Sequence, residues 1–173
     1  MTLTTTPGSA TADSYATLVQ ALAYHAVRGN AAWAASTDAL REAAMIRATI
    51  WVDNTYRPRW AGYRVNGRTQ ALDWPRNDVT DCDGFAVDYL TIPTEVASAT
   101  SEAALRELAV PGALSPDYVS SETVKTASAG PVSVTFADTS GAGSVTPILT
   151  IVDGILARLL GARSRNVAEL VRA

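Results

Sequence analysis

Few residues of this chain are of types that do chemistry. The one histidine among 173 residues, His25, lies in an expected helix with no cysteine or acid at metal-ligand spacing, so we expect a structural role for it. The one cysteine, Cys82, stands between Asp81 and Asp83, whose negative charges disfavour a reactive thiolate. The sequence contains no catalytic triad, zinc-ligand set or glycine-rich phosphate loop. We therefore predict a protein that is not an enzyme, with no catalytic residue, metal or cofactor.

An acidic turn, residues 78–84, is the one candidate for binding a metal ion. It carries three aspartates, Asp78, Asp81 and Asp83. An EF-hand loop aligned on the glycine of this turn would need an acid in place of Val79 and a glutamate in place of Leu90. Both are missing, so we interpret the segment as a hydrogen-bonded turn. Its aspartates are candidates for an acidic surface that pairs with a basic one.

A basic and aromatic stretch lies between residues 56 and 76, and two interpretations of it stay open. Its candidate residues are Arg57, Arg59, Trp60, Arg64, Arg68, Trp74 and Arg76. Aromatic rings interleaved with arginines hold single-stranded nucleic acid by stacking and charge, without reading its sequence. Alternatively, the two tryptophans anchor a loop, and the arginines pair with the acidic residues within one subunit or between subunits. We prefer this second interpretation, and the candidate residues are therefore assigned to a subunit interface or, under the first interpretation, to a DNA-facing surface.

Charge is distributed in blocks along the chain. Residues 41–76 contain seven arginines and three acids, residues 78–122 contain nine acids and one arginine, and the end of the chain is basic again. The net charge of −3 argues against a general nucleic-acid binder, which is usually basic. Such blocks suit a head-to-tail ring, in which a positive flank of one copy meets a negative flank of the next. A solvated surface without a partner is the alternative.

The hydrophobic pattern predicts a mainly α protein, a small bundle of about four helices. Capping residues, prolines and glycines delimit the expected helices, which run from residue 13 or 14 to 28, from 36 or 37 to 56, from 93 to 109 and from 144 or 146 to 161. In the second helix we expect Leu40 and Ile50 on the buried side and Arg41 in solvent. The last helix is apolar on more than one side, so we expect it to be deeply buried or packed against a second chain.

The segments between the helices complete the expected domain. Residues 57–91 form a long ordered loop, and the alternation of apolar residues after residue 131 indicates a β-hairpin at about 118–138, before the last helix. The helical domain would span residues 13–161, between an N-terminal arm, 1–12, and a C-terminal tail, 162–173. We expect no membrane-spanning segment and no signal peptide. The single cysteine rules out an internal disulfide bond, which suggests a reducing compartment.

Several short sequence pieces between residues 14 and 109 resemble a known family. They are Ser14-Tyr15-Ala16, Arg47-Ala48-Thr49, Asp53, Tyr56-Arg57, Trp60-x-Gly62-x-Arg64, Gln70-Ala71-Leu72-Asp73-Trp74-Pro75-Arg76, Asp81-x-Asp83-Gly84 and Ile92-Pro93. The family is commonly labelled DnaT-like single-stranded-DNA-binding, and it is similar to the head-tail adaptor (connector) proteins of long-tailed phages and gene-transfer agents. The most specific piece runs from Ala71 to Arg76.

This resemblance implies a virion structural protein at the head-tail junction, assembled in the host cytoplasm. About a dozen copies would form a ring beneath the capsid portal, join it to the next neck or tail-completion protein, and leave a channel through which DNA passes. Candidate residues for docking to the portal or neck are Arg163, Arg165 and Arg172 in the tail. No membrane is expected as a partner. The alternative that the family label implies is a single-stranded-DNA-binding replication accessory protein.

Overall fold

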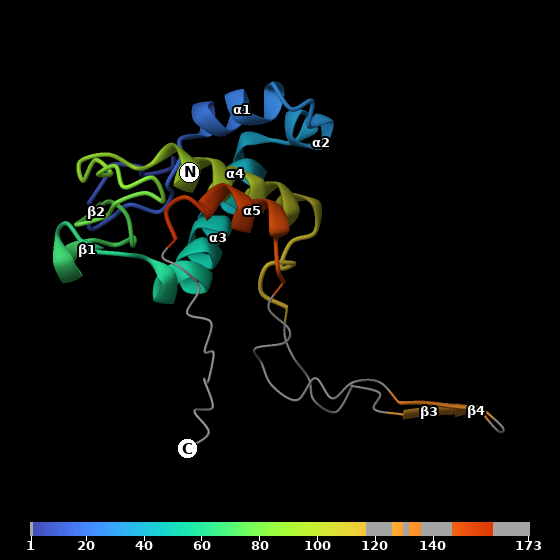
Figure 1. Ribbon diagram of the computed structural model, residues 1–173. Helices are drawn as coiled ribbons and strands as arrows, with labels where there is room; N and C mark the ends of the chain where they lie inside the picture. The colour runs from blue at the N-terminus through green and yellow to red at the C-terminus, as the bar shows by residue number, and fades with distance from the viewer. Residues whose placement is uncertain (1, 117–125, 130–131, 136–146, 161–173) are drawn as a thin grey trace, which may run out of the picture.

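The computed structural model of the chain describes residues 2–116, 126–129, 132–135 and 147–160 (Figure 1). Within them the protein is mainly α, as predicted, with five α-helices, two short 3-10 helices and two small antiparallel sheets. Helices α3 and α4 pack against each other at the centre, and α5 packs on α4. Helices α1 and α2 lie across one end of this pair, and the segment with β1 and β2 flanks it (Figure 1).

The central helices match the prediction. α3 (Asp38–Tyr56) begins after Thr37, whose hydroxyl accepts a hydrogen bond from the backbone of Leu40, and α4 (Thr94–Ala109) begins directly after Pro93. Their contact surface combines small and medium side chains that are fully buried, namely Met45, Ala48, Val52, Val96, Ala99 and Ala103. Alanines on facing helices let the two backbones approach closely, so a chain with few large apolar residues still forms a continuous core.

The expected burial of α3 was partly wrong. Leu40 is 58 % exposed and Ile50 is 53 % exposed, whereas Arg41 is buried. The Arg41 side chain donates to the carbonyl oxygens of Trp33 (2.9 Å) and Ala34 (2.8 Å) and pairs with Asp38, so it supplies hydrogen bonds to carbonyl groups at the end of α2. Apolar residues surround α3 on several sides, and its own sequence therefore did not define which side faces the core.

The expected first helix is shorter than predicted, and a second short helix follows it. α1 (Leu18–Ala26) begins after Thr17, which forms a capping box with Gln20, rather than at residue 13 or 14. Tyr15 precedes the helix and is buried. After Gly29 the chain forms a second short helix, α2 (Ala31–Ala35), where we expected a connection around Trp33.

Residues 57–91 form an ordered loop, as predicted, with little regular structure. It contains the 3-10 helices η1 (Arg57–Arg59) and η2 (Gly67–Thr69) and the strands β1 (Tyr63–Arg64) and β2 (Arg76–Asn77), which pair antiparallel with Tyr63 opposite Asn77. The N-terminal segment packs on this loop, since the backbone of Ala71 donates to Ser9 (3.0 Å) and the Asn66 amide donates to Gly8 (2.9 Å).

A β-hairpin precedes the last helix, as predicted: β3 (Thr126–Ala129) pairs with β4 (Val132–Thr135). The remaining parts of the expected hairpin, 118–125 and 136–138, lie outside the described residues. α5 (Thr150–Leu156) is much shorter than the expected helix, because the chain turns after Leu156 and bridges Leu160 to Trp60. No helix among the described residues has the length and apolar character required to cross a bilayer.

Candidate interaction surface

A buried hydrogen-bond cluster joins three parts of the chain that are distant in sequence. The Tyr15 hydroxyl donates to the carboxylate of Asp53 on α3 and accepts from the backbone N–H groups of Asp73 (2.9 Å) and Trp74 (3.1 Å) in the loop. The Asp73 N–H also donates to Asp53 Oδ2 (3.1 Å). The cluster therefore fastens the start of the chain and the loop onto the end of α3, and we call it the Tyr15–Asp53–Asp73 cluster.

Burial changes the acidity of this cluster. Removal from water raises the pKa of Asp53 to about 7, and the neighbouring Asp73 charge adds to the rise, although the Tyr15 hydrogen bond opposes it. Burial, followed by the charge of Asp53, raises the pKa of Tyr15 well above its ordinary value. The cluster thus holds a carboxyl group whose charge changes near neutral pH.

Two loop arginines surround this cluster. The Arg57 Nε donates to Asp73 Oδ2 (2.9 Å), and this hydrogen bond raises the pKa of Arg57. Arg76 is buried and donates to three backbone carbonyls, those of Ala61 (2.7 Å), Gly62 (2.7 Å) and Asp73 (3.2 Å). Burial lowers the pKa of the Arg76 guanidinium. Its three carbonyl contacts direct the side chain into the loop rather than toward a ligand outside.

The two loop tryptophans belong to the core. Trp60 is 7 % exposed and Trp74 is 1 % exposed, and their rings meet edge to face with centroids 5.5 Å apart. Tyr56, at the end of α3, contacts Trp60 with a centroid distance of 5.8 Å. Neither tryptophan presents a free face on which a nucleic-acid base could stack.

The remaining candidate residues of the loop lie in different environments. Arg59 pairs with Asp153 of α5 (3.3 Å), and Arg64 donates to the carbonyl of Gln70 (3.1 Å). Arg68 is exposed. Within the described residues, Arg57 and Arg59 therefore form ion pairs with Asp73 and Asp153 rather than with the acidic turn that we named as a possible complement.

The acidic residues 78–84 form the expected turn. Asp81 Oδ1 accepts hydrogen bonds from the backbone of Asp83 (3.0 Å) and of Phe85 (2.8 Å), and Asp78 is exposed with φ of +56°. Among the described residues, no group of three or more histidine, cysteine, aspartate or glutamate side chains could hold a metal ion. The candidate docking residues Arg163, Arg165 and Arg172 lie outside the described residues.

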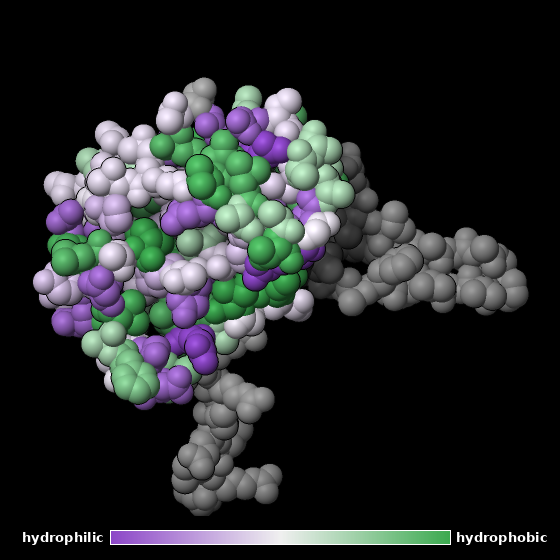
Figure 2. All heavy atoms as spheres, turned by 90° about the horizontal axis from the view of Figure 1, so that it is seen from above, coloured by the Kyte–Doolittle hydropathy of each residue, from purple (hydrophilic) through white to green (hydrophobic). Residues whose placement is uncertain are grey.

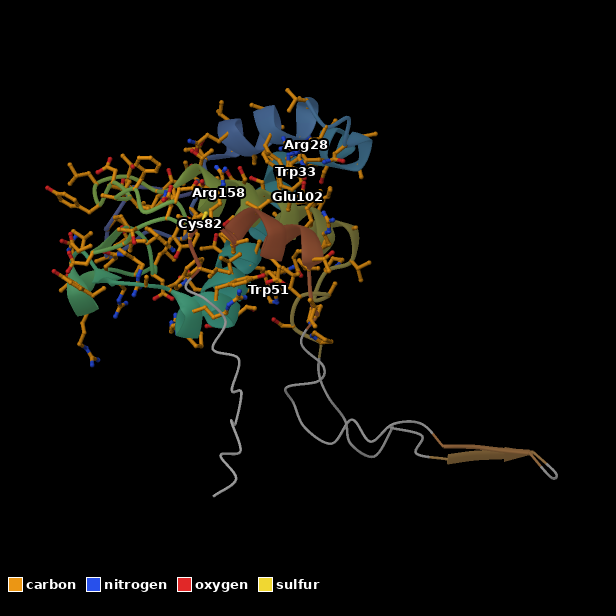
Figure 3. The ribbon with its side chains drawn as sticks, in the orientation of Figure 1. Arg28, Trp33, Trp51, Cys82, Glu102 and Arg158 are labelled. Carbon is orange, nitrogen blue, oxygen red and sulfur yellow. The ribbon has the colours of Figure 1, made fainter. Side chains whose placement is uncertain are left out.

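His25 is buried, whereas Cys82 is exposed. His25 is buried against Trp33 (centroids 4.3 Å), its Nε2 lies 3.1 Å from the carbonyl of Ser101 on α4, and burial lowers its pKa. This arrangement ties α1 to α4. Cys82 is exposed, and its backbone N–H donates to the carbonyl of Arg158 (2.9 Å). The two residues are labelled near each other in Figure 3.

Among the described residues, the helices also expose apolar side chains to solvent. A groove of about 630 Å³ lies between α1 and α2, lined almost entirely by carbon, with Val19, Leu22, Ala26, Gly29, Trp33 and Ala34 among its residues. Seen from above, Figure 2 shows hydrophobic groups gathered over these two helices. The sequence analysis did not predict this groove. The available signal was the pair of apolar residues Val19 and Val27, which are 75 % and 82 % exposed.

A second groove, of about 460 Å³, lies where α3 passes the end of α4. Its lining includes Leu40 and Ala43 from α3 and Leu108 and Pro111 from the end of α4. Arg47 crosses it and pairs with the buried carboxylate of Glu107 (3.1 Å). The exposure of Leu40 that contradicts the prediction for α3 thus coincides with an uncovered groove.

Comparison with known proteins agrees with the resemblance at the level of the family. The chain belongs to the family described as "Putative DnaT-like ssDNA binding protein", whose match covers residues 1–173. No curated protein and no solved structure shows a significant match to the chain. The residues that carry the family resemblance, Tyr15, Asp53, Arg57, Asp73 and Trp74, meet in or beside the buried cluster described above.

Proposed function

We propose that this protein is a non-catalytic assembly subunit, a head-tail adaptor that forms a ring between the capsid portal and the neck or tail of a virion. Its partners would be further copies of itself, the portal protein and the next neck or tail-completion protein, with DNA passing transiently through the central channel. It would be found in the virion neck after assembly in the host cytoplasm.

The observation that carries this proposal is the amount of apolar surface that one chain leaves uncovered. Val19, Leu40, Ile148 and Ile151 each expose more than 40 % of their surface, and they lie on three separate stretches of the chain. The α1–α2 groove adds a concave apolar face of about 630 Å³. A monomer that works alone rarely exposes several such faces, whereas a ring subunit covers them with neighbours on more than one side.

The loop supports the same proposal by its rigidity. Trp60, Trp74 and Arg76 fix residues 57–91 from inside, and the Tyr15–Asp53–Asp73 cluster fastens them to α3. A loop held in this way has lost its conformational freedom before a partner binds, so binding costs less ordering entropy.

Purified particles test the adaptor proposal directly. We expect mass spectrometry of tailed particles to find about a dozen copies of this chain per particle, as a closed ring requires. Tail-less particles from the same preparation serve as the comparison, because they show whether the chain joins the capsid before the tail. Absence of the chain from both kinds of particle would overturn the proposal.

Single-stranded-DNA binding is the second candidate, because the family description names it. The exposed surface offers a smaller site for it than the sequence indicated: Tyr63 is 58 % exposed on β1, Arg57 has a 59 % exposed side chain, and Arg68 is exposed on η2. An exposed aromatic ring can stack on a base and exposed arginines can pair with phosphates, so these three side chains of one loop are the candidate contacts for a short single strand.

Oligonucleotide binding measured over a range of salt concentrations tests this second candidate. If the surface binds single strands, Tyr63→Ala with Arg68→Ala should weaken binding and reduce the salt slope by about 0.7 for each lost phosphate contact. The matched control is Tyr89→Ala with Arg47→Ala, which removes an equally exposed tyrosine and arginine elsewhere. Equal binding by the two double variants would contradict a site at Tyr63.

A further inference from the structure

Three large apolar side chains stand in solvent on the segment between β2 and α4. Phe85 is 72 % exposed, Tyr89 is 51 % exposed and Leu90 is 64 % exposed. The segment is held in place by Asp81, which accepts from the Phe85 backbone (2.8 Å), and by Asp88, which accepts from the Leu90 backbone (2.9 Å). We call these three side chains the 85–90 patch. Such a concentration of exposed apolar groups marks an interaction site.

The charge around the 85–90 patch specifies the chemistry of its partner. Residues 78–94 contain four aspartates, Asp78, Asp81, Asp83 and Asp88, and no lysine or arginine. A partner that covers the patch therefore has to be cationic as well as apolar, since an acidic one would bring like charges together.

The described part of the chain ends beside this patch. The Arg158 carbonyl accepts a hydrogen bond from the Cys82 N–H (2.9 Å), so the last residues before the tail lie against the turn that leads into the patch (Figure 3). Residues 161–173 follow, with one acid, Glu169, and with both kinds of side chain that the patch requires: Arg163, Arg165, Arg172, Val167, Leu170 and Val171. At about 3.3 Å per residue, a segment of this length reaches across a neighbouring loop with room to spare.

We propose that residues 161–173 bind across the 85–90 patch of their own chain, with arginines opposite Asp81, Asp83 and Asp88 and with apolar residues over the three exposed side chains. The same chain is the occupant because a short connection from Leu160 gives the tail an effective concentration on the order of millimolar at this patch. The free protein then carries a cover over this apolar surface. This proposal does not depend on the proposed adaptor function.

The one cysteine of the chain reports on this cover. Cys82 is exposed in the turn beside the patch, so its reaction with an uncharged maleimide measures access to that turn. We expect the full chain to react about tenfold more slowly than a chain that ends at Leu160, which corresponds to about 1.4 kcal/mol of tail binding. Arg163→Glu with Arg165→Glu should accelerate the reaction similarly.

Electrostatics alone would produce the opposite result. Removing nearby arginines disfavours the thiolate and slows its reaction, so an acceleration means that a cover has been removed. Equal rates in the full chain, the shortened chain and the double variant would overturn the proposal.

A crosslink identifies which chain supplies the tail. In dilute protein, Val167→Cys should form a disulfide with Cys82 within one chain, whereas Val27→Cys, on the exposed end of α1, serves as the control and should not. Crosslinks that join two chains, or no more crosslinking by Val167→Cys than by Val27→Cys, would overturn the assignment to the same chain.

Discussion

Asp53 and Asp73 are two acidic side chains buried beside each other, each 4 % exposed, and their hydrogen-bond partners differ. Asp73 bonds Arg57, whereas the oxygens of Asp53 accept from Tyr15 and from the Asp73 backbone. Because burial raises the pKa of Asp53 to about 7, the folded chain retains a proton there that the unfolded chain releases near its ordinary pKa of 3.8.

Stability should therefore fall as the pH rises through this window. The contribution of Asp53 to the free energy of unfolding is fully present below about pH 4. It decreases by up to about 1.4 kcal/mol per pH unit as the pH rises, and the decrease ends above about pH 7. Urea unfolding of the wild type and of Asp53→Asn across this range measures it. His25, whose pKa is lowered by burial, shifts both proteins in the opposite sense, so the difference between them isolates Asp53. Parallel curves would contradict the prediction.

At Gly62 the loop passes close to its own backbone. Its φ is +63°, and a Cβ atom there would lie 1.9 Å from the backbone oxygen of Asn77. Gly62→Ala should cost more than about 3 kcal/mol or prevent folding, because rigid backbone has to move. The matched control is Gly67→Ala, with φ of +55° and no atom near the added carbon, which should cost about 1–2 kcal/mol. Chemical denaturation compares the two, and equal losses would contradict this account of Gly62.

At the scale of elements, a buried acid determines how α4 ends. The side chain of Glu107 is 1 % exposed and accepts from the backbone N–H groups of Gly112 (2.7 Å) and Leu114 (3.4 Å) as well as from Arg47. The turn after α4 is therefore folded back onto a carboxylate, in addition to the backbone hydrogen bond from Val110 to Arg106 that closes the helix.

Removing that carboxylate should destabilise the chain far more than removing its visible ion pair. Glu107→Ala removes the acceptor of the buried Leu114 N–H and of the Gly112 N–H, and we expect a loss of about 2–4 kcal/mol. Arg47→Ala should cost less than about 1 kcal/mol, because the Arg47 side chain is 56 % exposed. Thermal or urea unfolding of both variants checks this order, and a reversed order would show that the ion pair matters more than the backbone contacts.

At the scale of the whole molecule, a substitution in an uncovered groove should affect assembly without changing the stability of the single chain. Val19→Lys changes a residue of the α1–α2 groove that is 75 % exposed, so the free energy of unfolding should change by no more than about 0.5 kcal/mol. If the groove receives a neighbouring subunit, the same variant should reduce the number of copies found per particle. Val27→Lys, equally exposed on α1 but outside the groove lining, is the control and should assemble normally. Equal incorporation of both variants would exclude the groove as an interface.

The sequence by itself determined the elements whose signals are local. Capping residues and the spacing of apolar residues located α3 and α4 nearly to the residue, and the alternation around Val132 located the hairpin. Local signals suffice there because a helix or hairpin forms its hydrogen bonds within its own segment. The length and composition of residues 57–91 likewise predicted an ordered loop with tryptophan anchors as one of two interpretations.

Only the tertiary structure decided which surfaces face the core. Arg41 is buried because the carbonyl groups of α2 lie beside it. With Arg41 on the buried side of α3, the neighbouring Leu40 points toward solvent. The Tyr15–Asp53–Asp73 cluster joins residues up to 59 positions apart, and no periodicity within a segment encodes such a contact. The α1–α2 groove has the same origin, since a concave apolar face exists only after two helices have packed and left the side chains between them uncovered.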